Sequence, residues 1–438
     1  KIMPVLAPAN LHLGCSAGSC QRYSKLWKVF APLNLILLLF LLGAIIASLM
    51  LTRPHEIWVP PLDDQLIADY SSHLNSNDII LIIGAGAAGL FAGYTLEYFG
   101  MTNYRILEAS SDFGGRVQEM TNFLDVPIDL GAEWIHGDPK VLMDLLLFHN
   151  DTVDIETISY QPQTITVFRN GRRTSRNWFR FFYREFKFRN TTWYSYLKEY
   201  VVPYVQTKLI LNSPVMAIDY SGTHSNTSQI HVTTEDGRIF FADKVIMTVP
   251  LVVMNNTQLF PELPATKRQA MENVYIPSGL KVWIEFDEDF YSDMQLTGSL
   301  FGYNNDAPFF FDSVFRKPSS RHCLTYFDVS PNTHKLTGLD DDEILSKLIQ
   351  KLDNIFDGKA THHYLNHHVQ NWEKQPHIGG AYSFGWDNYD WTLRELQRPI
   401  NKKLYFAGEH TEPVEVATVH GAAISGRQAA QEVLKDLQ

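Results

Sequence analysis

The chain has 438 residues, which is long enough for two domains and a large buried core. Hydrophobic residues make up 45% and charged residues 19%, a balance typical of globular proteins. The net charge of −11 argues against a nucleic-acid-binding protein, because such proteins carry a basic patch or stripe. Cys15, Cys20 and Cys323 form no C-x-x-C pair, so the sequence predicts neither a zinc site nor a disulfide framework.

An uncharged segment over residues 29–51 is the first predicted element, and it is long enough to cross a bilayer as a helix. A cleaved signal peptide is the alternative, but its apolar core is shorter, about 7–15 residues. Basic residues precede the segment without any acidic residue, and acidic residues dominate after it. The positive-inside rule therefore places residues 1–28 in the cytosol and the folded part in a lumen or outside the cell. Sequons at Asn150, Asn190, Asn226 and Asn255 agree with this orientation.

A glycine-rich loop follows the apolar run IILII at 79–83. Gly84, Gly86 and Gly89 have the G-x-G-x-x-G spacing, in which the first glycine makes the tight turn and the second lets a pyrophosphate approach the backbone. A predicted helix begins in the loop, and a second strand then ends in Glu108, where an acid accepts hydrogen bonds from a ribose. This order predicts a dinucleotide site and leaves NAD and FAD open.

Two further motifs distinguish between NAD and FAD. SSDFGGRVQE contains Gly115 and Arg116, whose guanidinium can pair with a pyrophosphate, and IDLGAEWIHG contains Gly131, Ala132 and Trp134. With these motifs in this order, the sequence resembles the flavin-containing amine oxidase family. The resemblance implies FAD rather than NAD. It also implies that the Gly-Gly-Arg segment contacts FAD and that the G-A-x-W segment lies along the isoalloxazine ring.

The C-terminal segment LYFAGEHT reads as a strand that leads into Gly408 and Glu409, and a helix follows from about Thr418 and Val419. The resemblance implies that Glu409 binds the ribityl side of FAD. The N-terminal amides of the helix would face the pyrimidine oxygens, where a positive helix end stabilises negative charge on the reduced ring. Pieces that are far apart in sequence would therefore form two walls of one FAD site.

Three predicted β segments, at 209–220, 227–237 and 238–250, lie between those pieces. They resemble the family strands that cover the adenine, with Val215 in contact with it. Further on, Lys281 lies in a β pattern, and the resemblance gives it the role of holding a water against flavin N5. Trp372 and Tyr382 belong to a segment that resembles the substrate-side wall of the flavin.

Three positions shape the expected chemistry. Monoamine oxidases link the flavin to a cysteine at the position of Ala381, so the FAD is expected to be noncovalent. His136 matches a histidine beside the reacting amine in polyamine and spermine oxidases, where an imidazole can accept a proton. Glu133 occupies the variable position of G-A-x-W beside the flavin, and it is expected either to bind a distal ammonium or to lie in solvent.

The predicted fold is α/β: a discontinuous Rossmann-like FAD-binding domain and an α+β substrate domain with a mixed sheet, preceded by one transmembrane helix. A cytosolic tail (1–28), the anchor (29–51) and a linker (52–75) come first. The FAD-binding domain takes 76–140, 207–260 and 399–438. The substrate domain takes 141–206, expected as a shortened helical region, and 261–398. The histidines of 361–370 are assigned to a β segment rather than to a metal site.

These features predict a membrane-anchored flavin amine oxidase of the polyamine oxidase type. It would transfer a hydride from an amine to flavin N5 and would pass the electrons to oxygen, giving hydrogen peroxide. One alternative is an L-amino-acid oxidase, which needs an arginine to bind a carboxylate; Arg172, Arg173 and Arg180 are candidates. The other is a catalytically weak FAD-binding membrane protein.

Overall fold

The computed structural model describes residues 57–63, 77–148, 153–160, 164–169, 172–177, 185–222, 229–291, 294–297 and 309–437. The predicted anchor at 29–51 lies outside these ranges, as do Asn150 and Asn226 among the sequons. Within these ranges, no helix has the length and apolar character needed to cross a membrane. The anchor and its orientation therefore stay predictions.

A five-stranded parallel sheet, in the order β10-β2-β1-β14-β21, forms the centre of the nucleotide module. Its strands are β1 (Ile80–Ile83), β2 (Tyr104–Leu107), β10 (Leu209–Ile210), β14 (Lys244–Met247) and β21 (Leu404–Phe406). All four residues of β1 are buried, as expected for a central strand of a parallel sheet covered on both faces. The strands predicted before the glycine loop and before Gly408 are confirmed.

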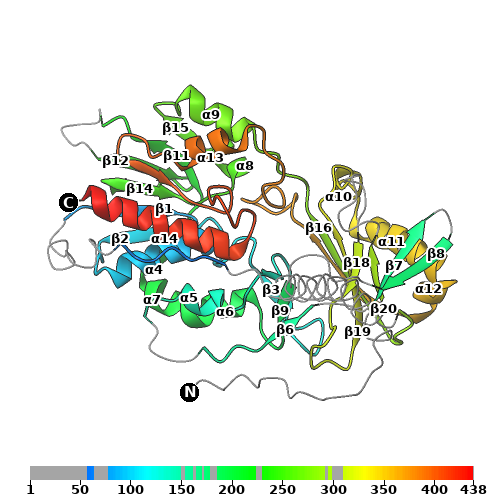
Figure 1. Cartoon of the computed structure of the whole chain (residues 1–438). Helices are drawn as coiled ribbons and strands as arrows, with labels where there is room; N and C mark the ends of the chain where they lie inside the picture. The colour runs from blue at the N-terminus through cyan, green and yellow to red at the C-terminus, as the bar shows by residue number, and fades with distance from the viewer. Residues whose placement is uncertain are drawn as a thin grey trace, which may run out of the picture. The chain divides into compact units, whose positions relative to one another are not determined.

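Helices α4 (Ala87–Tyr98) and α14 (Val419–Asp436) lie side by side along this sheet, although they come from opposite ends of the described chain (Figure 1). Their contact is close because Gly426 has no side chain: a Cβ there would lie 2.1 Å from the carbonyl oxygen of Ala88. The chain thus brings the glycine-loop helix and the C-terminal helix together, as the sequence predicts.

A four-stranded sheet, in the order β13-β12-β11-β15, adjoins the parallel sheet. Its strands are β11 (Val215–Asp219), β12 (Ile230–Thr234), β13 (Ile239–Ala242) and β15 (Gln258–Phe260). The single β segment predicted at 238–250 is wrong: the chain leaves this sheet after β13 and enters the parallel sheet as β14. Asp243 lies between β13 and β14, and its carboxylate accepts a hydrogen bond of 2.8 Å from the backbone N–H of Ile79.

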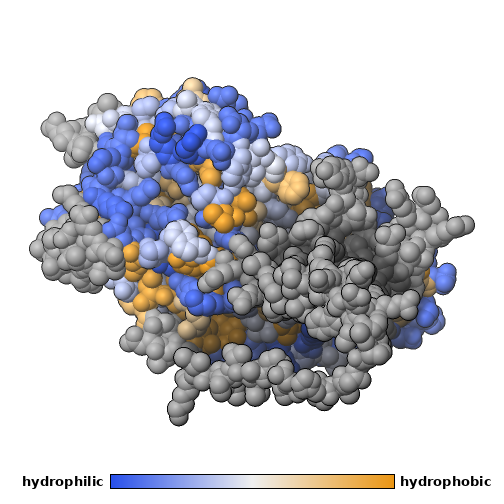
Figure 2. All heavy atoms as spheres, in the orientation of Figure 1, coloured by the Kyte–Doolittle hydropathy of each residue, from blue (hydrophilic) through white to orange (hydrophobic). Residues whose placement is uncertain are grey.

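Three helices accompany these sheets: α8 (Leu251–Asn256), α9 (Ala265–Glu272) and α13 (Tyr389–Gln397). α9 packs against α13. It buries Ala270 and Met271, whereas its outer face is hydrophilic (Figure 2). A polar outer face and a buried apolar face are typical of a helix at the surface of a globular protein.

The second module contains a seven-stranded mixed sheet in the order β20-β16-β19-β18-β17-β7-β8. Its strands are β7 (Thr164–Arg169), β8 (Arg172–Asn177), β16 (Leu280–Phe286), β17 (Met294–Thr297), β18 (Phe309–Asp312), β19 (His322–Asp328) and β20 (Tyr364–Asn371). β17 and β7 pair in parallel, and the other pairs are antiparallel. The expected mixed sheet is present.

Helix α11 (Asp341–Phe356) covers one face of the mixed sheet, where its buried side chains join those of β16 in one core cluster. The side chain of Asp340 caps its first turn by accepting from the N–H of Glu343. The short helices α10 (His334–Thr337) and α12 (Lys359–His363) flank it. β20 confirms the predicted β segment for His367 and His368, whereas the assignment of His362 and His363 to it is wrong, because they end α12. The described residues contain no cluster that could hold a metal ion.

Residues 141–206 differ from the shortened helical region that the sequence predicts. Among the described residues of this region, helices lie at its two ends, with α5 (Val141–Asp144) first and α6 (Trp193–Tyr200), α7 (Val202–Val205) and the 3₁₀ turn η1 (Gln206–Lys208) last. The middle forms strands β6 (Thr157–Ser159), β7, β8 and β9 (Glu185–Phe188). The β-branched residues of TITVF, followed by Asn-Gly, favour a hairpin over a helix.

Two small sheets connect the modules. β3 (Glu119–Met120) pairs with β4 (Ile128–Asp129), and β9 pairs with both β6 and β5 (Ile135–His136). In the three-stranded sheet β5-β9-β6, strand β5 follows Trp134 of the G-A-x-W motif directly in sequence. Strand pairing therefore places residues of the unpredicted strand β9 beside the site.

Candidate active site

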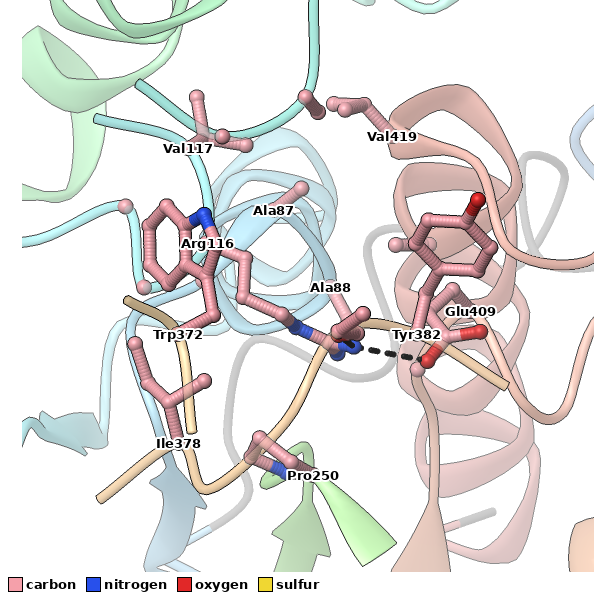
Figure 3. A pocket seen from close by; sticks show the side chains of 18 of the residues that line it. Ala87, Ala88, Arg116, Val117, Pro250, Trp372, Ile378, Tyr382, Glu409 and Val419 are labelled. Atoms are coloured by element: carbon pink, nitrogen blue, oxygen red, sulfur yellow. Dashed lines mark hydrogen bonds and ion pairs between the residues drawn. The ribbon is translucent and has the colours of Figure 1, made fainter. Parts of the chain in front are cut away.

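One cavity of about 790 Å³ brings the predicted site residues together. It is lined by the glycine loop, the segments around Arg116 and Gly131, the start of α14 and residues of the mixed sheet. All the residues predicted to bind cofactor or to act in catalysis line it, except Gly89. Figure 3 shows Arg116 extending between Trp372 on one side and Glu409 with Tyr382 on the other.

The three glycines of the loop have different structural roles. Gly84 has φ +104°, a conformation that L side chains rarely adopt. A Cβ at Gly89 would lie 1.9 Å from the carbonyl oxygen of Gly84, so this glycine lets α4 begin close to the strand. A Cβ at Gly86 would meet nothing nearer than 3.9 Å, so its backbone stays accessible from the cavity. Such access is what a phosphate group needs.

Glu108 follows β2 and turns its carboxylate toward the glycine loop. One oxygen accepts a hydrogen bond of 2.6 Å from the N–H of Ala85, and the other accepts one of 2.9 Å from the N–H of Ser110. The side chain is buried but lines the cavity. An acid fixed at the carboxyl end of the second strand is placed as in dinucleotide-binding folds, where it binds a ribose.

Arg116 pairs with Glu409 at 3.0 Å, which joins the first and last pieces of the nucleotide module (Figure 3). The same guanidinium nitrogen donates to the carbonyl oxygen of Ala381 at 2.6 Å. Burial alone would raise the pKa of Glu409, but Arg116, His410 and hydrogen bonding from Ser383 hold it below its ordinary value. Glu409 is therefore ionised at neutral pH and fixes the Arg116 side chain at the cavity wall.

The N-terminus of α14 opens into the cavity. Thr418 caps the helix by accepting from the N–H of Gly421 at 2.9 Å, and Val419 and Ala422 line the cavity wall. A helix of 18 residues carries the positive end of its macrodipole here. The cavity wall can therefore stabilise negative charge on a bound group.

Lys281 lies within β16 and is only 1% exposed. Its ammonium donates to the carbonyl oxygens of Asp129 at 3.2 Å and Gly131 at 2.9 Å, and to the carboxylate of Glu133 at 2.8 Å. These three acceptors match its three N–H donors. The predicted position of Lys281 in a strand is confirmed. The structure also shows that its ammonium has three hydrogen-bond acceptors within the protein.

The expectation that Glu133 lies in solvent is wrong, because its side chain is 4% exposed. The other expectation, that it binds a distal ammonium, stays a prediction, although each of its oxygens already has a partner in the protein. One oxygen accepts from Lys281, and the other accepts at 2.7 Å from Lys187, which sequence reasoning missed. Burial alone would raise the pKa of Glu133, but the two lysines lower it to about 2.

Lys187 is as buried as Lys281, and it comes from β9. Its ammonium lies over the rings of Tyr160 at 4.0 Å and Phe311 at 4.3 Å, in addition to its pairing with Glu133. Burial lowers its pKa to about 8, although Glu133 acts in the opposite direction. The sequence EFKF at 185–188 held a signal for this position: its two charged residues, Glu185 and Lys187, are two apart and share one face of a strand.

His136 and Glu185 form the second polar pair at the cavity. They are direct partners in the pairing of β5 with β9, and their side chains approach to 2.8 Å between Nδ1 and Oε2. The side chains are 44% and 34% exposed, and both line the cavity. The sequence analysis predicted His136 as a site residue but not Glu185, because strand β9, which carries Glu185, was not predicted.

Aromatic side chains complete the walls. Trp372 is buried and packs against Gly131, where a Cβ would lie 2.9 Å from the indole ring. Burial and the nearby Glu409 raise the pKa of Tyr382 to about 12, so its phenol is neutral at physiological pH. Val215 and Ala132 line the cavity as well. The predicted residues thus meet in space, and their individual roles stay proposals.

The residues present fit a dinucleotide. Gly86 leaves the backbone open, Glu108 provides a fixed acceptor, and the start of α14 provides a positive helix end. The cavity volume lies within the range of about 300–1,000 Å³ that is usual for ligand pockets. Ala381 lines the cavity without a nucleophilic side chain, so it offers no attachment to a flavin.

Comparisons with known proteins place this site in a family. The family described as flavin containing amine oxidoreductase matches residues 167–434, and the NAD(P)-binding Rossmann-like domain matches residues 82–146. The human peroxisomal N(1)-acetyl-spermine/spermidine oxidase is 28% identical over 257 residues, 52% of this chain and 50% of that protein. The lysine-specific histone demethylase 1B homolog of Caenorhabditis elegans is 28% identical over 246 residues, 52% of this chain and 30% of that protein.

Solved structures show the same fold. Cyclohexylamine oxidase from Brevibacterium oxydans IH-35A matches with a TM-score of 0.69 at 15% identity, covering 83% of this chain and 100% of that chain. Putrescine oxidase bound to putrescine matches with a TM-score of 0.67 at 15% identity, covering 82% and 99%. The chain spans about half or less of the curated relatives named above. Because the family match covers more than half of its residues, the chain belongs to the flavin-containing amine oxidoreductase family, with FAD as its cofactor.

Proposed function

We propose that this chain oxidises a polyamine and passes the electrons to oxygen. The glycine loop, Glu108 and the start of α14 would hold FAD, which would supply an acceptor for the hydride on the carbon next to the reacting nitrogen. The resulting imine is hydrolysed by water to an aldehyde and an amine, and oxygen takes up the two electrons and leaves as hydrogen peroxide. The observation that carries the proposal is that one cavity joins the nucleotide residues to a wall containing His136 and Glu185.

Glu185 is the carboxylate that we assign to a distal ammonium of the substrate. Glu133, the residue expected to do this from the sequence, already places one oxygen on Lys187 and the other on Lys281. Glu185 pairs with the imidazole of His136, and its side chain is 34% exposed at the cavity. A substrate ammonium can replace or join the imidazole there, because a carboxylate accepts several hydrogen bonds.

The reacting end of the amine would lie against aromatic walls of the cavity. Tyr382, Phe309 and Phe327 are among the side chains that line it. Ring faces attract a cationic amine and orient a neutral one. Only the reacting nitrogen needs to lose its proton, so a polyamine can keep its charge at Glu185 while its other end is oxidised.

The names of relatives support an amine substrate but differ in its kind. One relative is named an N(1)-acetyl-spermine/spermidine oxidase and another a histone demethylase. We favour a free polyamine because the pair at the cavity includes a half-buried carboxylate that lines it and because the chain carries a net charge of −11. A negative protein attracts polycations over a distance set by the ionic strength.

The test is flavin reduction without oxygen across a panel of spermine, N1-acetylspermine, putrescine, benzylamine and leucine. We expect the polyamines to reduce the flavin faster than benzylamine, and leucine to be the slowest. Leucine as the best substrate would favour the L-amino-acid oxidase; of its candidate arginines, Arg180 lies outside the described residues. No reduction by any amine would favour the catalytically weak FAD-binding protein.

Glu185→Gln tests the assigned residue. It should raise KM for spermine about ten-fold or more and leave KM for benzylamine within about two-fold, because a charge-assisted hydrogen bond contributes about 1.5–3 kcal/mol. Glu156→Gln is the matched control: Glu156 also pairs with a basic residue, Arg189, but does not line the cavity. Equal effects on both amines, or the same effect from the control, would remove Glu185 from substrate binding.

A further inference from the structure

Lys187, Glu133 and Lys281 form one buried unit. Glu133 places one carboxylate oxygen on each ammonium, at 2.7 Å from Lys187 and 2.8 Å from Lys281. The side chains of the two lysines are each 1% exposed, and that of Glu133 is 5% exposed. Lys187 and Lys281 do not bond to each other, so the carboxylate is the link between them.

The unit carries two positive charges and one negative charge. Glu133 is ionised, because the lysines hold its pKa at about 2. Other titratable groups act on the unit: Lys317, Asp129, whose pKa burial raises to about 7, and Asp312, whose pKa burial raises to about 6. Glu133 and Lys281 line the cavity, whereas Lys187 lies behind them among aromatic rings. The excess positive charge of the unit therefore stands at the cavity wall through Lys281.

The charge balance depends on Lys187. Without it, Glu133 and Lys281 would be a neutral ion pair, and the ammonium of Lys281 would be fully compensated. With it, the carboxylate is shared, and one unit of positive charge remains beside the cavity. A buried charge acts strongly on its surroundings because protein interiors screen charge far less than water does.

We propose that Lys187 is a positioning residue for the flavin chemistry of this chain: through Glu133 it fixes the ammonium of Lys281 and leaves the cavity wall with one net positive charge. This inference rests on the FAD site but not on the identity of the amine. A reduced flavin carries more negative charge than an oxidised one, so the positive charge favours the reduced form. The unit thereby makes the bound FAD a stronger oxidant.

The test is the midpoint potential of the bound flavin, measured anaerobically against a redox dye. Lys187→Met should lower the ratio of reduced to oxidised flavin at a fixed potential about ten-fold, which is about 30 mV for a two-electron couple. The double variant Glu133→Gln with Lys187→Met should return the ratio to within about three-fold of the wild type, because the charge of Lys281 is then uncompensated again. The measurement needs bound flavin but no turnover, so a failed amine assay would not affect it.

A matched control separates this role from stability. Lys267 is also a buried lysine, 2% exposed, but it donates to the carbonyl oxygens of Glu395 and Leu396 and does not line the cavity. Lys267→Met should lower the melting temperature and leave the flavin potential unchanged. Lys187→Gln keeps a hydrogen-bond donor for Glu133 and replaces Lys187→Met if that variant fails to retain flavin. An unchanged potential in the Lys187 variants, or no recovery in the double variant, would overturn the proposal.

Discussion

Gly426→Ala is the sharpest test of the contact that closes the nucleotide module. The new Cβ would lie 2.1 Å from the carbonyl oxygen of Ala88 and 2.9 Å from its carbonyl carbon, whereas ordinary van der Waals contact begins at 3.4 Å. Both obstacles are backbone atoms, so no side-chain rotation relieves the clash. We expect α14 to move away from α4 by roughly 1 Å.

Two effects of opposite sign set the size of the change. Alanine is favoured over glycine inside a helix by about 1 kcal/mol, which would stabilise the variant. Overpacking costs about 1–3 kcal/mol, and a backbone clash belongs at the upper end of that range. The net loss of unfolding free energy is therefore about 1–2 kcal/mol. At an unfolding entropy of about 2.1 cal/mol/K per residue, a chain of 438 residues loses about 1 °C for each kcal/mol, so the melting temperature should fall by about 1–2 °C.

The assay is thermal unfolding of the FAD-loaded protein, together with the FAD-to-protein ratio after gel filtration. FAD should be released more readily from the variant, because the first turn of α14 lines the cavity. Gly338→Ala is the control: it lies at the exposed end of α10, where the nearest atom to a new Cβ is 3.5 Å away. A variant at Gly426 that melts at or above the wild-type temperature and keeps its FAD would refute the packing argument.

Three further predictions use other parts of the chain. Burial lowers the pKa of His410 to about 4 from 6.5, so the unfolded chain binds a proton that the folded chain excludes; the unfolding free energy should fall by roughly 3 kcal/mol from pH 6.5 to 4. Urea titrations should show a smaller pH dependence for His410→Gln, and equal losses in both proteins would contradict the assignment. Acid precipitation should release all the flavin, because Ala381 offers no nucleophile; flavin left in the pellet would mean a covalent link elsewhere. The uncharged segment at 29–51 should keep the protein in membranes after carbonate extraction, and full extraction would favour cleavage of the segment.

The sequence predicted the nucleotide part of the site well because local rules govern it. The spacing of Gly84, Gly86 and Gly89 follows from turn geometry and from the approach of a helix to a strand, both of which a short motif encodes. The return of the C-terminal segment was predicted only through the resemblance. The glycine at 426 permits the close contact of this segment with Ala88, but it carries no signal for that contact in a single sequence.

The charged unit around Glu133 was not predictable in the same way. Its two lysines lie 54 and 148 residues away in the chain, on strands that meet only in the folded protein. The region that supplies Lys187 was expected to be helical, which left the strand pairing of β9 with β5 and β6 unseen. The sequence therefore could not show that both oxygens of Glu133 accept hydrogen bonds from lysines of the same chain.

The central claim is that this chain holds FAD in one cavity and reduces it with an amine. The most direct measurement mixes the purified FAD-loaded protein with spermine under anaerobic conditions and follows the visible absorption of the flavin. The account predicts full loss of that absorption, its recovery on admission of oxygen, and one hydrogen peroxide for each flavin reoxidised. A protein that binds no FAD, or bound FAD that no amine of the panel reduces, would contradict it.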